Sequence, residues 1–210
     1  MLALSRSQKD FLQEATSTYH ANVEMAHDYL AKRGLSAATA DMYRLGVVAQ
    51  THAALGDEDY VGRLTIPYIT ASGDVVALRY RTMTGQEPKY LSAAGTQTHL
   101  FSVTSLLADS DTVVVTEGEI DAMTLNQIGI PAVGVPGARA FKPHFPLLFE
   151  DFDRVLIACD GDQAGREFGR LVSDQIHGAI AVHMPEGQDV NSVYVSSGED
   201  ELKSLLRMGQ

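Results

Sequence analysis

The sequence predicts an α/β fold in which an α+β N-terminal subdomain precedes a domain with a mostly parallel, helix-flanked sheet. From residue 111 onward, short apolar runs typical of buried strands alternate with helical segments, which is the pattern of a doubly wound parallel sheet. Before residue 110, two alternating runs joined by turn residues follow a helical segment and predict an antiparallel hairpin. We therefore expect an N-terminal subdomain at 1–110, a parallel-sheet domain at 111–196 and a C-terminal helix at 197–210.

The N-terminal subdomain is expected to begin with helices. Apolar residues recur at helical spacing across 22–45, where Gly34 is typical of a helix end and Ser36 of the N-cap of a second, short helix. Strands are expected at 64–70 and 75–80, because apolar and polar residues alternate there around a Ser-Gly-Asp turn. This part of the chain is therefore predicted to be helices followed by a hairpin.

The second half of the chain alternates strands and helices. The β-branched run Thr112–Thr116 and the apolar run Arg154–Cys159 are typical of strands that are buried on both faces. Gly129 and Gly178 stand where helix ends are expected. The strands are predicted at Thr112–Thr116, 132–135, Arg154–Cys159 and 179–184, and the helices at 119–128, 164–176 and 199–207.

Charge is unevenly distributed along the 210 residues, which include 16 Lys and Arg against 27 Asp and Glu, a formal charge of −11. That balance excludes a protein that holds nucleic acid by a broad basic surface, because neutralising phosphates needs clustered cations. Residues 61–91 are the exception, with four cations, two acids and a local charge of +2. Arg79 and Arg81 share one face of the second strand, opposite Tyr80, so they could track successive phosphates; the alternative is a solvated basic face.

Cysteine and hydropathy patterns limit the class of protein. Cys159 is the one cysteine, which excludes a disulfide framework and a cysteine-based structural zinc site. No run approaches the ~20 apolar residues that a membrane helix needs, and the N-terminal apolar run is too short for a signal peptide. We therefore expect a soluble, cytoplasmic protein with no membrane partner.

Acidic residues follow the predicted parallel strands. Glu117 ends the first strand, Asp160 and Asp162 end the third, and Asp189 follows the last. Asp121 comes one helical turn after Glu117 and can face the same edge. Carboxyl ends of parallel strands form the functional edge of such sheets, and clustered carboxylates select Mg²⁺ or Mn²⁺. We therefore predict a metal site; the alternative is that each acid caps the helix that follows it.

The motifs in this half resemble those of TOPRIM domains. VVVTEGEIDAMT matches the glutamate motif at Glu117 and Asp121, and VLIACDGDQAGRE matches the Asp-x-Asp motif at Asp160 and Asp162. The resemblance covers about residues 111–195. TOPRIM domains occur in DnaG-type primases, topoisomerases and some nucleases, so this match alone leaves the activity open.

The upstream part resembles the beginning of a DnaG-type primase catalytic core. YLAKRGLSAATADMYRLG is similar to its helical entry and RLTIPYITASGDVVALRYR to the strand pair that follows. PKYLSAAGTQTHLF is similar to the basic PKYL segment of bacterial primases, onto which Lys89 and Tyr90 map. With both matches, nearly the whole chain resembles a primase core of the bacterial or phage type.

The resemblance implies template-directed synthesis of short RNA primers from NTPs on single-stranded DNA, with Mg²⁺ or Mn²⁺ as cofactor. The catalytic acids that it implies are Glu117, Asp121, Asp160 and Asp162. The implied metal ligands are Glu117, Asp160, Asp162 and Asp189. The residues expected to hold the template or the NTP are Arg63, Arg79, Arg81, Lys89 and Tyr90, with Arg139 and Arg166 as weaker candidates.

The chain departs from the bacterial primase pattern in two ways. Bacterial primases carry a second Asp after the last strand, whereas this chain has Asn191 at that place. In this feature the chain resembles phage-type primase–helicases. The change weakens the case for Asn191 as a metal ligand. One cysteine cannot build the zinc module of such proteins, and no helicase region follows. We therefore expect a phage or mobile-element protein, or part of a split gene, in a bacterial or phage-infected cell. A replicative helicase and a zinc-module protein are its implied partners in trans.

Two other functions stay open at this point. A TOPRIM-type nuclease would use the same acids to direct water at a phosphodiester, although the PKYL segment argues against it. A non-catalytic module would bind single-stranded DNA or recruit a helicase. Incubation with metal and nucleic acid, with and without NTPs, separates the nuclease from the primase, and metal binding without any product favours the module.

Overall fold

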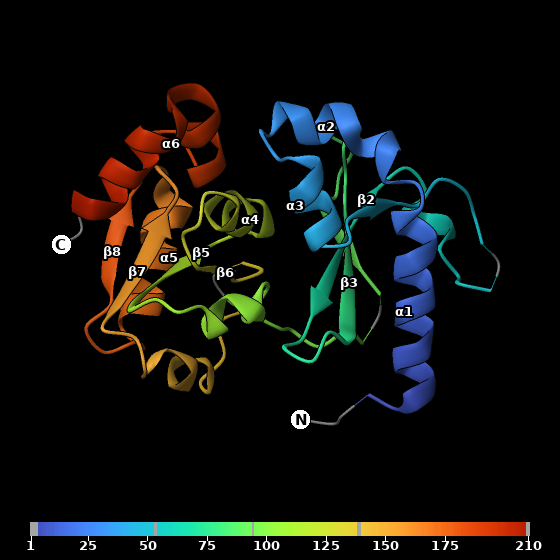
Figure 1. Cartoon of the computed structure of the whole chain (residues 1–210), viewed down its shortest axis with the longest axis horizontal. Helices are drawn as coiled ribbons and strands as arrows, with labels where there is room; N and C mark the ends of the chain where they lie inside the picture. The colour runs from blue at the N-terminus through green and yellow to red at the C-terminus, as the bar shows by residue number, and fades with distance from the viewer. Residues whose placement is uncertain (1–3, 53, 94, 138–139, 209–210) are drawn as a thin grey trace. The chain divides into compact units, whose positions relative to one another are not determined.

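Two compact units make up the chain, Met1–Gln97 and Thr98–Gln210 (Figure 1). Phe101 exchanges two backbone hydrogen bonds of 2.8 and 3.1 Å with Gly134, so the segment after Gln97 is attached to the sheet of the second unit. The domain boundaries at 110 and 196 stay a prediction. The computed structural model describes residues 4–52, 54–93, 95–137 and 140–208.

Helices begin the first unit. They are α1 (Arg6–His20), α2 (His27–Lys32) and α3 (Ala37–Met42), with 3₁₀ turns at Val23–Ala26 and Glu58–Tyr60. As predicted, Gly34 follows α2 with a φ of 64°, and Ser36 caps α3, because its hydroxyl accepts a hydrogen bond from the backbone N–H of Thr39 at 3.1 Å. Helix α1 is not among the predicted elements, although Ser5 and Gln8 form a capping box at its start.

An antiparallel sheet completes the first unit. Its strands, in spatial order, are β1 (Gly46–Val47), β2 (Leu64–Ile69), β3 (Val75–Arg81) and β4 (Tyr90–Ser92). The predicted hairpin is confirmed as β2 and β3, which pair Thr65 with Tyr80. Helix α1 packs against β3. The buried cluster between them is formed by Ala15, Tyr19, Val48, Val75, Leu78 and Tyr80.

A fully buried carboxylate, Asp57, links distant parts of this unit. Its Oδ2 accepts a hydrogen bond from the Tyr19 hydroxyl at 2.9 Å and lies 3.1 Å from Nδ1 of His52, while its Oδ1 accepts from the backbone N–H of His52 at 2.7 Å. Burial raises the pKa of Asp57, but the hydrogen bonds together outweigh burial and bring the pKa below its ordinary value of 3.8. The fold therefore stabilises the ionised form.

Asp57→Asn is expected to lower the free energy of unfolding by about 1–3 kcal/mol at neutral pH, because the amide cannot accept the same set of hydrogen bonds. Since folding lowers the pKa of Asp57, its stabilising effect is fully present above the unfolded-state value of 3.8 and is lost as the pH falls through the folded-state pKa. Urea unfolding of both proteins across this pH range measures the difference. The two stabilities should converge in acid, and a difference that does not change with pH would contradict the assignment.

The second unit contains a four-stranded parallel sheet in the order β6-β5-β7-β8. Its strands are β5 (Thr112–Thr116), β6 (Ala132–Gly134), β7 (Arg154–Cys159) and β8 (Ile180–His183). Its helices are α4 (Glu119–Gln127), α5 (Gln163–Ser173) and α6 (Val190–Met208), with 3₁₀ turns at Val103–Leu107 and Phe145–Phe149. The predicted α/β fold, with a parallel, helix-flanked sheet in this half, is confirmed.

Helix α6 is longer than the helix predicted at 199–207. It begins at Val190, directly after Asp189, and Gly198 interrupts its helical backbone with a φ of 85°, a conformation that glycine adopts without steric cost. Neither α6 nor any other helix in the described ranges is long and apolar enough to cross a membrane.

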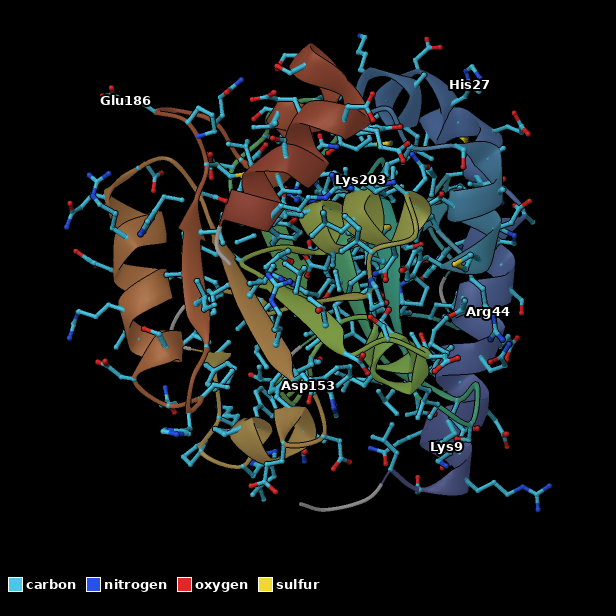
Figure 2. All side chains as sticks on the ribbon, turned by 60° about the vertical axis from the view of Figure 1, so that its left-hand side comes forward. Lys9, His27, Arg44, Asp153, Glu186 and Lys203 are labelled. Carbon is cyan, nitrogen blue, oxygen red and sulfur yellow. The ribbon has the colours of Figure 1, made fainter. Side chains whose placement is uncertain are left out.

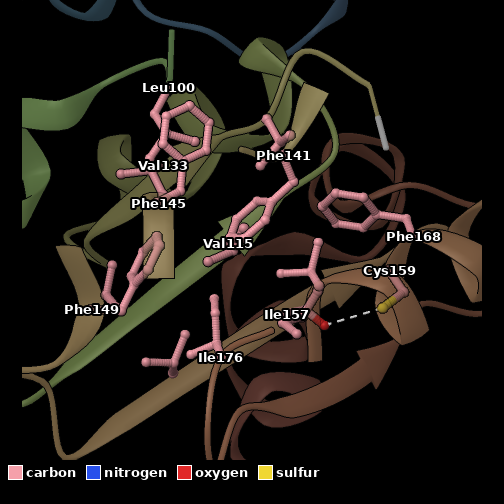
Figure 3. Close-up of a cluster of buried hydrophobic side chains, with 14 residues drawn as sticks. Leu100, Val115, Val133, Phe141, Phe145, Phe149, Ile157, Cys159, Phe168 and Ile176 are labelled. Atoms are coloured by element: carbon pink, nitrogen blue, oxygen red, sulfur yellow. Dashed lines mark hydrogen bonds between the residues drawn. The ribbon is translucent and has the colours of Figure 1, made fainter. Parts of the chain in front are cut away.

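Apolar side chains cover both faces of the parallel sheet, and Figure 3 shows the cluster on one of them. On that face Val115 packs in one cluster with Phe168 of α5. Val114 and Leu156 point to the opposite face, where they line a cavity together with Leu206 of α6. Burial on both faces explains why these strands are continuous apolar runs in the sequence.

Candidate functional site

The parallel strands bring two carboxylates to one edge of the sheet. Thr116 of β5 lies beside Ala158 of β7, so Glu117 and Asp160 leave the sheet at the same edge. Both residues are half-buried, and Oε2 of Glu117 is shielded from solvent. Burial raises the pKa of Cys159 to about 12, and the negative charges of Asp160 and Glu117 contribute to that rise. Both carboxylates therefore lie within electrostatic reach of one buried thiol.

Asp121 joins two helices. It lies in the first turn of α4 with only 8% of its surface exposed, and its Oδ1 accepts a hydrogen bond from the backbone N–H of Asn191 at 3.0 Å. The Asn191 side chain is also buried, and its Nδ2 donates to Oγ1 of Thr124 at 2.9 Å. Asn191 therefore attaches α6 to α4, a structural contact that does not depend on a metal.

Asp162 and Asp189 each cap a helix with one carboxylate oxygen. Oδ1 of Asp162 accepts from the backbone N–H of Gly165 at 2.8 Å at the start of α5. Oδ1 of Asp189 accepts from the backbone N–H of Ser192 at 2.7 Å, and the Ser192 hydroxyl accepts from the backbone N–H of Asp189 at 2.8 Å. The capping alternative therefore holds for these oxygens. Within the described chain, neither Oδ2 accepts a hydrogen bond.

Backbone hydrogen bonds attach the segment before α6 to the turn after β7. The N–H of Gly161 donates to the carbonyl of Gln188 at 2.8 Å, and the N–H of Gly187 donates to the carbonyl of Gly161 at 2.9 Å. Gly161 permits this approach, since a Cβ there would lie 1.8 Å from the carbonyl oxygen of Pro185. These contacts bring Asp189 to the edge of the sheet that Asp160 occupies.

The acids do not form a closed cluster. Across the described ranges, no three His, Cys, Asp or Glu residues come close enough together to hold a metal ion. One oxygen each of Asp121, Asp162 and Asp189 accepts a backbone hydrogen bond. The donor set still fits Mg²⁺ or Mn²⁺, since it consists of carboxylate oxygens at one sheet edge. The predicted ligands thus follow the carboxyl ends of parallel strands at one edge of the sheet.

Two of the predicted nucleic-acid residues, Arg63 and Arg81, are buried in the first unit. Nη1 of Arg63 donates to the carbonyl of Pro88 at 2.9 Å. Nε of Arg81 donates to the Tyr29 hydroxyl at 2.5 Å, and its Nη1 donates to the Tyr90 hydroxyl. Contact of Arg63 and Arg81 with a template or an NTP stays a prediction. In the structure both arginines hold the chain in and just before β4.

Arg79, Lys89 and Tyr90 lie nearer the surface. The Arg79 guanidinium carbon lies 4.1 Å from the centroid of the Tyr90 ring, and that of Arg81 lies 5.0 Å from it, so both arginines use the same aromatic side chain. Tyr80 belongs to the core on the other face, as the alternation predicts. Lys89 is exposed. Of the predicted nucleic-acid residues, the two cations nearest the surface are therefore Arg79 and Lys89, which we call the basic strip of the first unit.

Other residues complete the comparison with the sequence. Glu119, in the first turn of α4, is fully buried with a solvent-shielded Oε2. It is not among the predicted acids, although its place directly after Glu117 and Gly118 is the feature of the sequence that could have identified it. Arg166 is exposed, and its Nη2 donates to Oε1 of Gln163 at 3.2 Å. Arg139 lies outside the described residues.

Several known proteins are similar to this chain in sequence. The family described as Toprim-like matches residues 114–194. The Gene 57 protein of Mycobacterium phage D29 is 44% identical over 147 residues, which cover 68% of this chain and 97% of that protein. A DNA primase of Thermotoga maritima is 25% identical over 229 residues, which cover 98% of this chain and 40% of that primase. This chain belongs to the DnaG-type primase core family.

The fold agrees with that of a DnaG-type core. A solved structure of the DnaG primase catalytic domain bound to single-stranded DNA has a TM-score of 0.78 at 20% identity, covering 95% of this chain and 78% of that one. The chain spans less than half of the Thermotoga primase that it matches. The acids at the sheet edge all lie within the Toprim-like part of this DnaG-type core: Glu117, Asp121, Asp160, Asp162 and Asp189.

Proposed function

We propose that this chain is the catalytic core of a DNA primase that synthesises short RNA primers from NTPs on single-stranded DNA, with Mg²⁺ or Mn²⁺. The observation that carries the proposal is the row of carboxylates at the carboxyl edge of the parallel sheet in a DnaG-type core. The DnaG catalytic domain solved with bound single-stranded DNA supports the same kind of template for this chain.

The acids have different parts in the proposed reaction. Asp160, Asp162 and Asp189 would hold the metal, and Oδ2 of Asp162 and of Asp189 is left for this by the helix caps. A bound divalent ion supplies positive charge to the triphosphate and its leaving group. Glu117 accepts the proton of the primer 3′-hydroxyl as general base or joins the ligands. Asp121 keeps α4 against the start of α6 and so positions the other acids.

The basic strip holds phosphates in this proposal. Lys89 is exposed, and the Arg79 guanidinium lies against the ring of Tyr90, which is itself half-buried, so both cations are placed toward the surface of the first unit. Arg63 and Arg81 position this surface through their bonds to Pro88 and Tyr90. Contacts between cations and phosphates act mainly on the affinity for the template. Loss of Arg79 or Lys89 should therefore weaken template binding without changing the chemical step.

Arg79→Gln is expected to weaken binding to single-stranded DNA and to reduce the slope of log affinity against log salt by about 1, because one phosphate contact is lost. Fluorescence anisotropy with a labelled oligonucleotide over a range of salt concentrations measures both effects. Arg170→Gln is the matched control, since Arg170 is an exposed arginine of α5 that pairs with Asp174. Equal slopes for Arg79→Gln and the wild-type chain would show that Arg79 makes no phosphate contact.

The proposed activity is tested by incubating the chain with single-stranded DNA and labelled NTPs in Mg²⁺ or Mn²⁺. Short RNA products that need both the template and the NTPs support a primase. Shortened DNA without NTPs would instead indicate a TOPRIM-type nuclease, and metal binding without either product would indicate a non-catalytic module. Parallel reactions with a replicative helicase and a zinc-module primase protein test the proposed partners in trans.

A further inference from the structure

A cavity of about 250 Å³ lies in the second unit, away from the acids. It is lined by the beginnings of β5 and β7, where Thr112 pairs with Arg154, and by the last turns of α6. The acids follow the carboxyl ends of these same strands. The cavity therefore lies toward the opposite end of the sheet, and a molecule bound in it would not occupy the metal site.

Three cations line this cavity: Arg154, Lys203 and Arg207. Arg154 is the unusual one, because its Nη2 is shielded from solvent and meets no hydrogen-bond acceptor among the described residues. Its neighbour Asp153, labelled in Figure 2, is exposed and forms no ion pair with it in the described chain. A buried donor without an acceptor is costly, and more so when it is charged. A ligand oxygen in the cavity would remove that cost.

Charge and shape indicate the kind of ligand. Lys203 is paired with Glu199 at 2.5 Å, so the net positive charge at the cavity comes from Arg154 and Arg207. Two unneutralised guanidiniums match a phosphate monoester, which carries about two negative charges near neutral pH and suits the planar arginine fork. The rest of the wall is largely apolar and includes Pro131, Leu156 and Leu206, which suits an organic group attached to the phosphate.

We propose that this cavity is a binding site for a small organic phosphate, with a nucleoside monophosphate as the representative ligand. The phosphate binds Arg154 and Arg207, and the organic part packs against Leu156 and Leu206. At about 250 Å³ the cavity is smaller than the ~300–1,000 Å³ typical of drug-sized ligands, so it encloses the phosphate and the adjoining part of one nucleotide and is too small for a strand. This inference does not depend on the proposed primase activity.

Isothermal titration of the full chain with AMP tests the site, in EDTA so that metal-dependent binding at the acids is excluded. Inorganic phosphate and adenosine are titrated separately, to distinguish the two halves of the ligand. We expect AMP to bind more tightly than either. Arg154→Met and Arg207→Gln should each weaken AMP binding at least about 10-fold, whereas the exposed control Arg170→Gln and the acid-edge variant Asp160→Asn should bind AMP as the wild-type chain does.

Thermal unfolding separates a binding arginine from a structural one. Arg154→Met keeps the apolar stem and removes a charge whose Nη2 is buried without an acceptor, so without ligand it should unfold at the same or a higher temperature than the wild type. Its melting temperature should no longer rise with AMP. Failure of millimolar AMP to bind, equal affinities for AMP and inorganic phosphate, or undiminished AMP binding by Arg154→Met would each overturn the proposal.

Discussion

Asp160→Asn is expected to reduce primer synthesis at least about 100-fold while the fold is retained. Asp160 follows β7 directly, at the edge of the sheet that Glu117 also occupies. The amide keeps the size of the carboxylate but removes the negative charge that would bind a divalent cation. Incorporation of labelled NTPs on single-stranded DNA measures the activity, and calorimetric titration with Mn²⁺ measures the loss of metal affinity.

Asp153→Asn is the matched control for this experiment. Asp153 is an exposed acid that precedes β7, whereas Asp160 follows it, so the two substitutions change the net charge equally at opposite ends of one strand. The control should keep wild-type activity and Mn²⁺ affinity. Full activity in Asp160→Asn, or equal losses in both variants, would exclude a special part for Asp160 in the metal site.

Gly165→Ala is expected to destabilise the second unit by at least about 2 kcal/mol, which corresponds to a fall in melting temperature of about 4–8 °C. A Cβ at this position would lie 2.2 Å from the carbonyl oxygen and 2.6 Å from the nitrogen of Asp160, and backbone atoms cannot move aside as a flexible side chain can. Gly165 also donates the hydrogen bond that Asp162 accepts. The substitution should therefore shift both acids and lower primer synthesis as well.

The sign of this effect is informative, because alanine favours a helix over glycine by about 1 kcal/mol. In α5, without the close approach to Asp160, Gly165→Ala would raise stability. Calorimetric melting of the wild type, Gly165→Ala and the exposed control Arg170→Ala measures the difference. An unchanged or raised melting temperature for Gly165→Ala would contradict the close packing of α5 against the turn after β7.

The sequence predicts the parts of this fold that depend on regular spacing. The continuous runs of β5 and β7 are visible because both of their faces are buried, and Ser36 is recognisable because an N-cap needs a side-chain acceptor. The row of acids follows from strand direction alone, since Glu117 and Asp160 end parallel neighbours. These features need no knowledge of distant contacts.

Features that depend on distant partners are not visible in the sequence. A count of charges assigns Arg63 and Arg81 to a basic surface, but the carbonyl of Pro88 and the hydroxyls of Tyr29 and Tyr90 bind them inside the first unit. The same limit applies to Asp162 and Asp189, whose residue types suit both a cap and a metal ligand. Only the fold shows that one oxygen of each serves the cap.

The most direct test of the proposed function is whether the product copies its template. The wild-type chain is incubated with Mg²⁺ or Mn²⁺, single-stranded DNA of a defined mixed sequence and all four NTPs, and the products are sequenced. A DNA primase yields short RNA complementary to the DNA, and Asp160→Asn yields at least about 100-fold less of it. Products that do not match the template, or cleaved DNA in place of RNA, would contradict the proposal that the acids of this DnaG-type core carry out templated primer synthesis.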